Sequence, residues 1–323
     1  MIGTSHNFFE TDAQIAKRIQ IDKIKDNKEG DPIRLSSKAL CMAIHSNNVF
    51  IGEAGALAKK YCMESKKPVT TFKGHSAPVC AIAVNGAFVI TGSWDKTIRA
   101  YDHSGNHSKS LIGHNDFVKC IHFVNHKVII SGSSDKTIRV WNLEEDECTS
   151  VIKVMSAVQS ICIAEEFIFV ATSDSVISKY TLQGNLISSL NGHETSVFGL
   201  FQTDSETLFS CSADNTVIQW DLYSEKVADR YSHEDWVTAI TFWNGKLVTA
   251  SRDGKIRIIS IATGNVEHVF WGHFDHISAI GLLDDKLISV SLDCTLRSWS
   301  IMLEENSKLM TEEEERELEM LLE

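Results

Sequence analysis

An all-β fold, a β-propeller of seven blades, is the class that the sequence predicts, because two residue series run along the chain with one period. The first series is Gly-His or the variant Ser-His, with histidines spaced by 39, 79 (two periods), 40 and 40 residues: His75, His114, His193, His233 and His273. The second is an aspartate after small residues, spaced by 40, 39, 40, 39 and 40: Asp95, Asp135, Asp174, Asp214, Asp253 and Asp293. A shared period of about 40 residues indicates a repeated structural unit.

Each unit has the pattern of short β-strands separated by turns. Apolar runs such as Val128–Ile130 and Thr137–Trp141 are too short for helices and are rich in β-branched residues. The residues between such runs include Asn85-Gly86 and Asn244-Gly245, which favour two-residue hairpin turns. Four short strands in about 40 residues are typical of one propeller blade.

A seventh, worn unit precedes the six that contain the aspartate. Gly55 stands one period before Asp95, the strand-like Val49–Gly52 comes before it, and Tyr61 ends the stretch that follows. Leu40–Ile44 is expected to form the first strand of this unit. The sequence therefore predicts seven blades, and the alternative is a closed ring of six with a separate N-terminal hairpin.

The best preserved unit resembles a repeat of the WD-repeat family of β-propellers. It contains Gly113-His114 followed by Ser131–Asn142, and a later unit has the Trp220-Asp221 pair that gives the family its name. The resemblance covers roughly residues 33–303. It implies the fold strongly but not a particular activity, because one fold carries many functions.

The resemblance divides the chain into an N-terminal extension (1–30), a propeller (31–303) and an acidic tail (304–323). It also implies that Ile33–Leu35 forms the outer strand of the last blade, which closes the ring and removes an exposed edge. The two flanking segments carry helix-start signatures, at Thr11 and at Thr311. We expect short helices there, and the sequence leaves open whether they pack on the propeller or bind a partner.

By the same resemblance, a histidine, a serine, an aspartate and a tryptophan of each unit form a structural hydrogen-bond network. Three units have all four residues: His114, Ser131, Asp135 and Trp141; His193, Ser210, Asp214 and Trp220; His273, Ser289, Asp293 and Trp299. Catalytic triads use the same first three residue types, but a triad occurs once in a site, whereas these sets repeat with the blade. The sequence therefore predicts no enzyme, no catalytic residue, no metal site and no cofactor.

The other units are less complete. In these the network residues are His75, Thr91 and Asp95 with Tyr101; His233, Thr249 and Asp253 with Ile259; and Asp174 with Tyr180 but no histidine. The first unit keeps almost nothing of the pattern.

The resemblance also implies a binding face, because WD-repeat propellers mostly bind proteins through the top face around the central channel. The residues at the corresponding contact positions that stand out are Trp94, Phe117, Lys119, Phe198, Trp236, Arg252 and His276. Exposed aromatic and arginine side chains are the usual anchors of protein interfaces. Our hypothesis is one protein-binding patch, and the alternative is that the rings pack on neighbouring loops.

Charge and composition narrow the classes of partner. The net charge is −12, of which residues 302–323 carry −7 (nine acidic and two basic residues), so the remaining 301 residues carry only −5. A nearly neutral body without a general basic face argues against direct nucleic-acid binding. No apolar run reaches the roughly 20 residues of a membrane span.

These features predict an intracellular protein of the cytoplasm or nucleus. The start of the chain lacks a secretory pattern, and the eight cysteines form no C-x-x-C pair, as expected of reduced thiols. The predicted function is a non-enzymatic interaction scaffold or adaptor, monomeric within a larger complex. The alternatives are a substrate-recognition subunit of a ubiquitin ligase, although the expected arginine is missing after Trp220-Asp221, or a subunit of a nucleic-acid or chromatin complex.

Overall fold

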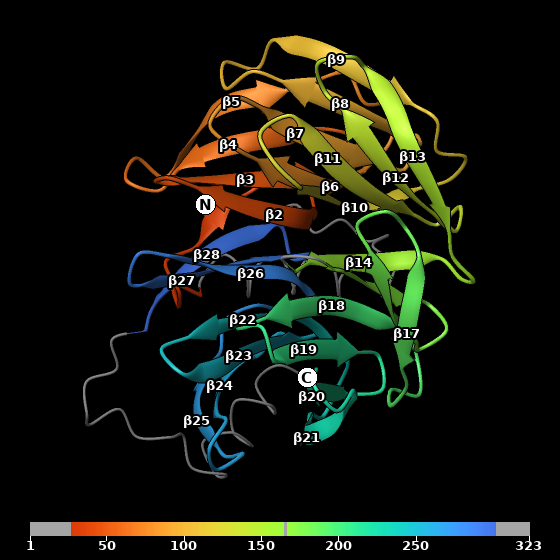
Figure 1. Ribbon diagram of the computed structural model, residues 1–323. Coiled ribbons are helices and arrows are strands. Elements are labelled where there is room, and N and C mark those ends of the chain that lie inside the picture. The colour runs from red at the N-terminus through yellow and green to blue at the C-terminus, as the bar shows by residue number, and fades with distance from the viewer. Residues whose placement is uncertain (1–26, 165–166, 302–323) are drawn as a thin grey trace, which may run out of the picture.

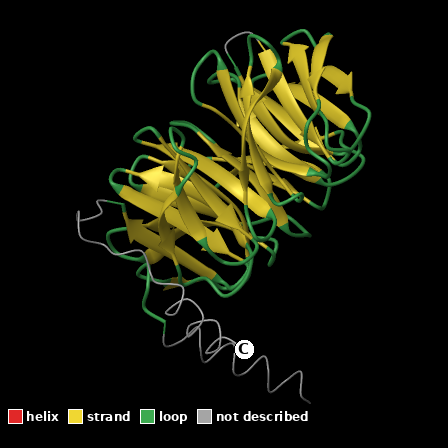
Figure 2. Cartoon of the chain, turned by 90° about the horizontal axis from the view of Figure 1, so that it is seen from below, coloured by secondary structure: helices red, strands yellow, loops and turns green. Residues whose placement is uncertain are grey.

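The computed structural model describes residues 27–164 and 167–301. They form seven antiparallel four-stranded sheets around a common centre, as the blades of a propeller do (Figure 1). Figure 2 shows only strands and connecting loops in this part of the chain. The helices expected after Thr11 and Thr311 lie outside the described residues.

We number the blades 1 to 7 in chain order, and in blades 1 to 6 the strands follow one another from the centre to the rim. Blades 1 to 4 consist of β2 (Ala39–His45), β3 (Asn48–Glu53), β4 (Ala58–Cys62) and β5 (Lys67–Phe72); β6 (Val79–Val84), β7 (Val89–Ser93), β8 (Thr97–Tyr101) and β9 (His107–Ile112); β10 (Val118–Phe123), β11 (Val128–Ser133), β12 (Thr137–Asn142) and β13 (Glu147–Lys153); β14 (Val158–Ile163), β15 (Phe167–Thr172), β16 (Ile177–Thr181) and β17 (Leu186–Leu190). Blades 5 to 7 consist of β18 (Val197–Gln202), β19 (Thr207–Ser212), β20 (Thr216–Asp221) and β21 (Lys226–Ser232); β22 (Val237–Trp243), β23 (Lys246–Ser251), β24 (Ile256–Ser260) and β25 (Val266–Phe270); β26 (Ile277–Leu283), β27 (Lys286–Ser291), β28 (Thr295–Ser300) and, at the rim, β1 (Ile33–Arg34).

The ring is closed in two ways. The innermost strands contact one another around the centre, and β2 of blade 1 lies against β26 of blade 7 (Figure 1). At the rim, β1 pairs with β28, with Ile33 opposite Leu296 and Arg34 opposite Thr295. The seven-bladed prediction and the N-terminal outer strand are thus confirmed, and the six-bladed alternative is wrong. Closure leaves the last blade with a paired strand instead of an open edge.

The hydrophobic core lies between neighbouring blades and not at the centre of the ring. In one cluster, Ile90 and Ile98 of blade 2 meet Val118, Ile121 and Ile129 of blade 3, and each is at most 3 % exposed. Such a side chain stabilises a fold by roughly 1.5–3 kcal/mol on burial. Seven similar clusters around the ring make each blade depend on its two neighbours.

A glycine inside the small-residue run lets adjacent blades approach closely. A Cβ atom added at Gly132 would lie 2.4 Å from Val158 of the next blade and 2.7 Å from the Cys120 thiol. No side chain tolerates such distances without a shift of the inner strand. The run Ser131–Ser133 is therefore small because two sheets and an inner strand meet there.

A turn that is repeated from blade to blade defines one face of the ring. After the aspartate of blades 2 to 7 one residue is left-handed, with φ between 64° and 78°: Lys96, Lys136, Ser175, Asn215, Gly254 and Cys294. The carboxylate holds this turn, and Asp95 Oδ1 accepts the Thr97 N–H at 2.9 Å. We call top face, in every blade, this turn together with the segment before the first strand; in blade 2 they are joined by the Trp94 N–H to Pro78 carbonyl bond. The bottom face is the opposite end of the strands.

Candidate functional site: the top face and its central pocket

A buried hydrogen-bond chain braces the top of blades 3, 5 and 7. In blade 7, His273 Nδ1 lies 2.8 Å from Asp293 Oδ2 and Nε2 lies 2.7 Å from Ser289 Oγ, which also accepts the Trp299 indole N–H at 2.8 Å. Blades 3 and 5 have the same bonds at 2.7 to 2.9 Å: His114, Ser131, Asp135 and Trp141; His193, Ser210, Asp214 and Trp220.

The directions of these bonds follow from the charges. Burial alone would raise the pKa of Asp293, but hydrogen bonds from His273 and Thr295 outweigh it and lower that pKa. Burial lowers the pKa of His273, an effect that Asp293 partly offsets. An ionised aspartate beside a neutral imidazole fixes the tautomer: Nδ1–H donates to the carboxylate and Nε2 accepts the serine O–H. Every donor in the chain is used, which makes the arrangement rigid.

The same geometry places the triad-like residues in the interior of the blade, where no substrate reaches them. The serines Ser131, Ser210 and Ser289 are 0 % exposed, and each hydroxyl already accepts an indole N–H while bonded to the histidine. A nucleophile has to meet the atom that it attacks. These hydroxyls contact only the interior of the blade.

Blade 6 departs from the pattern. His233 Nε2 lies 2.9 Å from Thr249 Oγ1 and Nδ1 lies 3.3 Å from the Tyr231 carbonyl, while Asp253 is bonded at 2.7 Å by Arg257. The resemblance implied a histidine–aspartate bond here as well. Ile259 takes the place of the tryptophan of the complete blades, and Asp253 forms an ion pair with Arg257.

Acid is expected to destabilise the propeller before its carboxylates are protonated. Burial lowers the pKa of His233 to about 4 and holds those of His114 and His273 below the usual 6.5. The unfolded chain titrates these groups near 6.5, so unfolding takes up protons between pH 6.5 and about 4, and stability falls as the pH falls. We expect a loss of about 1–2 kcal/mol from pH 7 to pH 5 in urea unfolding.

The variant His233→Gln tests this expectation, because it removes a histidine whose pKa is lowered to about 4, while glutamine can still donate to Thr249. Its stability should depend less on pH than that of the unmodified protein. Unfolding midpoints that are equal at pH 7 and pH 5 in the unmodified protein would contradict the assignment.

Blade 1 has its own polar cluster around a buried carboxylate, which could not be predicted from the repeat pattern. Glu53 is 0 % exposed and accepts hydrogen bonds from the hydroxyls of Ser36 and Ser37, and Lys59 Nζ lies 3.3 Å away. Counted by period, Glu53 takes the place of Ser93. The sequence signal for this cluster was a charged residue at a position that small residues occupy in the other blades.

All seven residues predicted for the binding face either take part in one of two aromatic clusters or line one pocket. In the first cluster, Trp94 and Phe117 are stacked, with ring centroids 5.1 Å apart. In the second, the Trp236 ring lies 6.0 Å from that of Phe198, and the Arg252 guanidinium carbon lies 4.3 Å from its centroid. The rings pack on neighbouring loops and also stay accessible to a partner, because each tryptophan remains 38 % exposed.

Between the two clusters a central pocket of about 420 Å³ opens on the top face. All seven blades contribute to its wall: Leu40, Cys41, Met42, Cys80, Trp94, Lys119, Cys120, Gln159, Ser160, Phe198, Thr238, His276, Ser278, Ala279 and Leu292. Trp94, Lys119, Phe198 and His276 of the predicted patch line this pocket directly. The side chains of Phe117, Trp236 and Arg252 join it through the two clusters.

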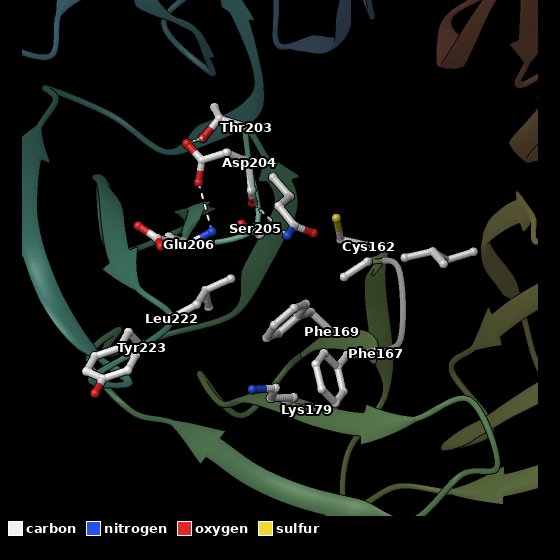
Figure 3. A pocket seen from close by; sticks show the side chains of 13 residues that line it. Cys162, Phe167, Phe169, Lys179, Thr203, Asp204, Ser205, Glu206, Leu222 and Tyr223 are labelled. Carbon is white, nitrogen blue, oxygen red and sulfur yellow. Dashed lines mark hydrogen bonds between the residues drawn. The ribbon is translucent and has the colours of Figure 1, made fainter.

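A second cavity, of about 610 Å³, lies between blades 4 and 5 on the bottom face (Figure 3). The rings of Phe167 and Phe169 form one wall, with Lys179 Nζ 4.5 Å from the Phe167 centroid and 3.4 Å from Glu225 Oε1. Tyr223, 93 % exposed, stands at the outer edge. Nothing in the sequence pointed to it, because its wall combines hairpin ends from two blades.

Two structural features are absent from the described residues. Among residues 27–164 and 167–301, no group of three histidine, cysteine, aspartate or glutamate side chains is placed to hold one metal ion. The same ranges contain no helix with the length and hydropathy needed to cross a lipid bilayer.

The comparisons agree with the repeat. The family model described as WD domain, G-beta repeat, matches residues 66–102, 105–142, 184–221 and 224–260. An uncharacterized WD repeat-containing protein of Schizosaccharomyces pombe is 30% identical over 91% of this chain and 88% of its own length. The chain belongs to the WD-repeat family of β-propellers.

Other similarities are looser. The nuclear distribution protein nudF of Emericella nidulans is 28% identical over 48% of this chain and 32% of its own length, and the ribosome biogenesis protein YTM1 of Candida glabrata is 26% identical over 69% and 46%. The crystal structure of the computationally designed Ika8 protein superposes with a TM-score of 0.68 at 23% identity, covering 81% of this chain and 83% of that one. This likeness concerns the fold alone.

Proposed function

We propose that this protein is a non-enzymatic scaffold or adaptor subunit of a larger intracellular complex, acting in the cytoplasm or nucleus, and that it binds a protein partner through the top face. The observation that carries the proposal is the pair of half-exposed aromatic clusters on either side of the central pocket. Membership in a family whose repeats occur in proteins such as nuclear distribution and ribosome biogenesis proteins supports it.

Trp94 and Trp236 keep 38 % of their surface in water, although each packs on a second aromatic ring that holds it in place. Large rigid rings bury much area on binding at a small entropic cost. Arg252, held over Trp236 and paired with Asp235 at 3.0 Å, adds directional donors to that cluster.

The double variant Trp236→Ala/Arg252→Ala tests the proposal. It is expected to weaken partner binding at least tenfold, since interface anchors of these types are typically worth 2 kcal/mol or more on truncation. The measurement is affinity purification of the full chain from native cells with quantitative mass spectrometry. Tyr223→Ala, at an exposed aromatic on the bottom face, is the matched control and should leave recovery unchanged.

Thermal unfolding of both variants accompanies the purification, because loss of binding counts only in a folded chain. Undiminished recovery of every partner by the folded double variant would mean that this patch is not the binding surface.

A further inference from the structure

The central pocket has an unusual balance of polar groups. Three side chains on its wall offer N–H donors: Lys119 on β10, Gln159 on β14 and His276 at the top of blade 7. Among the described residues that line it there is no aspartate and no glutamate. The pocket therefore presents donors and one positive charge to whatever enters it.

These three donors differ from two hydroxyls beside them. Thr238 and Ser278 each donate to a backbone carbonyl of the next blade, that of Ile277 and that of Ala39 respectively. Within the described residues, by contrast, the side chains of Lys119, Gln159 and His276 make neither a hydrogen bond nor an ion pair. Half-buried N–H donors without acceptors gain hydrogen-bond energy when a ligand supplies the acceptors.

Lys119 also differs from two other cations of the top face, Arg252 and Lys38. Arg252 is paired with Asp235 at 3.0 Å, and Lys38 with Asp275 at 3.6 Å. The Lys119 ammonium instead lies where thiol, aliphatic and aromatic groups form most of the wall. A charge pair is stronger in such surroundings than in open water, so the pocket favours an anion over a neutral or cationic group.

We propose that the central pocket receives an aspartate or glutamate side chain from an extended segment of the partner that lies across the top face between the two aromatic clusters. This inference rests on the proposed function, since it names the chemistry of the partner at the same site. The carboxylate pairs with Lys119 and accepts from Gln159 and His276. One cation with two neutral donors matches a single negative charge better than a phosphate dianion, which recurrently binds at arginine clusters.

The test uses biotinylated pools of random decapeptides that differ only in one fixed central residue: Asp, Glu, Asn, Gln, Lys or phosphoserine. The full chain is measured against each pool by biolayer interferometry. We expect the Asp and Glu pools to bind about tenfold better than their Asn and Gln counterparts, the ratio expected when one charge-assisted hydrogen bond is lost.

Variants at Lys119 test the residue itself. Lys119→Met should abolish the preference for acidic pools, Lys119→Arg should keep it, and Lys119→Glu should transfer it to the Lys pool. Tyr223→Ala on the bottom face is the control and should behave as the unmodified chain. Each variant is checked for an unchanged melting temperature, and the arginine and glutamate variants keep the experiment decisive should the methionine variant unfold.

Three results would overturn the inference: equal binding of the Asp and Asn pools, a preference for phosphoserine over Asp and Glu, or acidic preference that survives Lys119→Glu. In each case some peptide binding at the top face remains, and the scaffold proposal stands. Failure of every pool, together with partner recovery that the Trp236→Ala/Arg252→Ala variant leaves unchanged, would instead reject both. Binding that appears only after Glu312–Glu315 are replaced by glutamine would assign the pocket to the chain's own tail and not to a partner.

Discussion

Replacement of His273 by alanine is expected to lower the free energy of unfolding by about 3 kcal/mol. The variant removes the partner of a carboxylate that is only 8 % exposed, and it leaves the Ser289 hydroxyl without its acceptor. A buried charge that loses its partner is costly, typically 3–5 kcal/mol, and part of that cost is recovered by the bonds that Asp293 keeps to Thr295. Urea unfolding at pH 7 measures the difference.

Blade 6 supplies a matched control for this experiment. His233 occupies the equivalent position but bonds only Thr249 and a backbone carbonyl, because Asp253 is held by Arg257. His233→Ala should therefore cost about 1 kcal/mol, the value of a single ordinary hydrogen bond. Equal losses in the two variants would show that the histidine contributes through packing alone. A loss of partner binding at an unchanged melting temperature would contradict a structural role for His273.

The fold could be predicted almost completely from the sequence, for a physical reason. The residues that repeat are those that solve the same local problem in each blade: a carboxylate that holds a left-handed turn, and a glycine where two sheets approach. Asp95 and Gly132 are examples. Because each constraint is local and recurs with the blade, periodicity reveals it even where no single copy is complete. The strand Ile33–Arg34, which pairs with residues far along the chain, was found only through the resemblance.

The candidate site could be predicted in part. Trp94 was predicted from its position before the aspartate, and Trp236 from its position beside the start of the inner strand of its blade. The structure places Trp94 on the wall of the central pocket and Trp236 in contact with Phe198 on that wall. The shape of that pocket was not predictable, because it depends on how far seven inner strands stand from one another. Nor was the Arg257–Asp253 ion pair predictable, since Arg139 and Arg297 take the same position in blades whose aspartate bonds the histidine instead.

Blade 1 shows where a repeat pattern misleads. Its unit lacks the network of histidine, serine, aspartate and tryptophan, yet a different polar cluster occupies the same place. Around the buried Glu53, Lys59 and the hydroxyls of Ser36 and Ser37 form a polar cluster that links the segment before β2 to β3 and β4. The negative charge also acts on Tyr61, whose pKa is raised to about 12 by burial first and by Glu53 second. Residues that form an equivalent network in another blade are therefore recognised by the contacts they make and not by their residue type.

Glu53→Ala is accordingly expected to destabilise the protein by about 3 kcal/mol, although blade 1 has the weakest repeat signature. The substitution leaves Lys59, whose side chain is only 12 % exposed, without its counter-charge, and leaves two serine hydroxyls without their acceptor. The measurement is urea unfolding at pH 7. A cost below roughly 1 kcal/mol, the usual range of an exposed ion pair, would mean that water replaces the carboxylate and that the cluster is not part of the fold's support.

The double variant Glu53→Leu/Lys59→Met separates the ion pair from the space it fills. Taking two charges out of water costs free energy that their attraction only partly returns, so an apolar pair of similar volume is often as stable as the ion pair it replaces. We expect the double variant to regain most of the stability that Glu53→Ala loses, whereas Lys59→Met alone should be destabilised because the carboxylate stays buried and unpaired. A double variant as unstable as the sum of the two single changes would show that the serine bonds, and not the charge pair, hold the segment before β2 against blade 1.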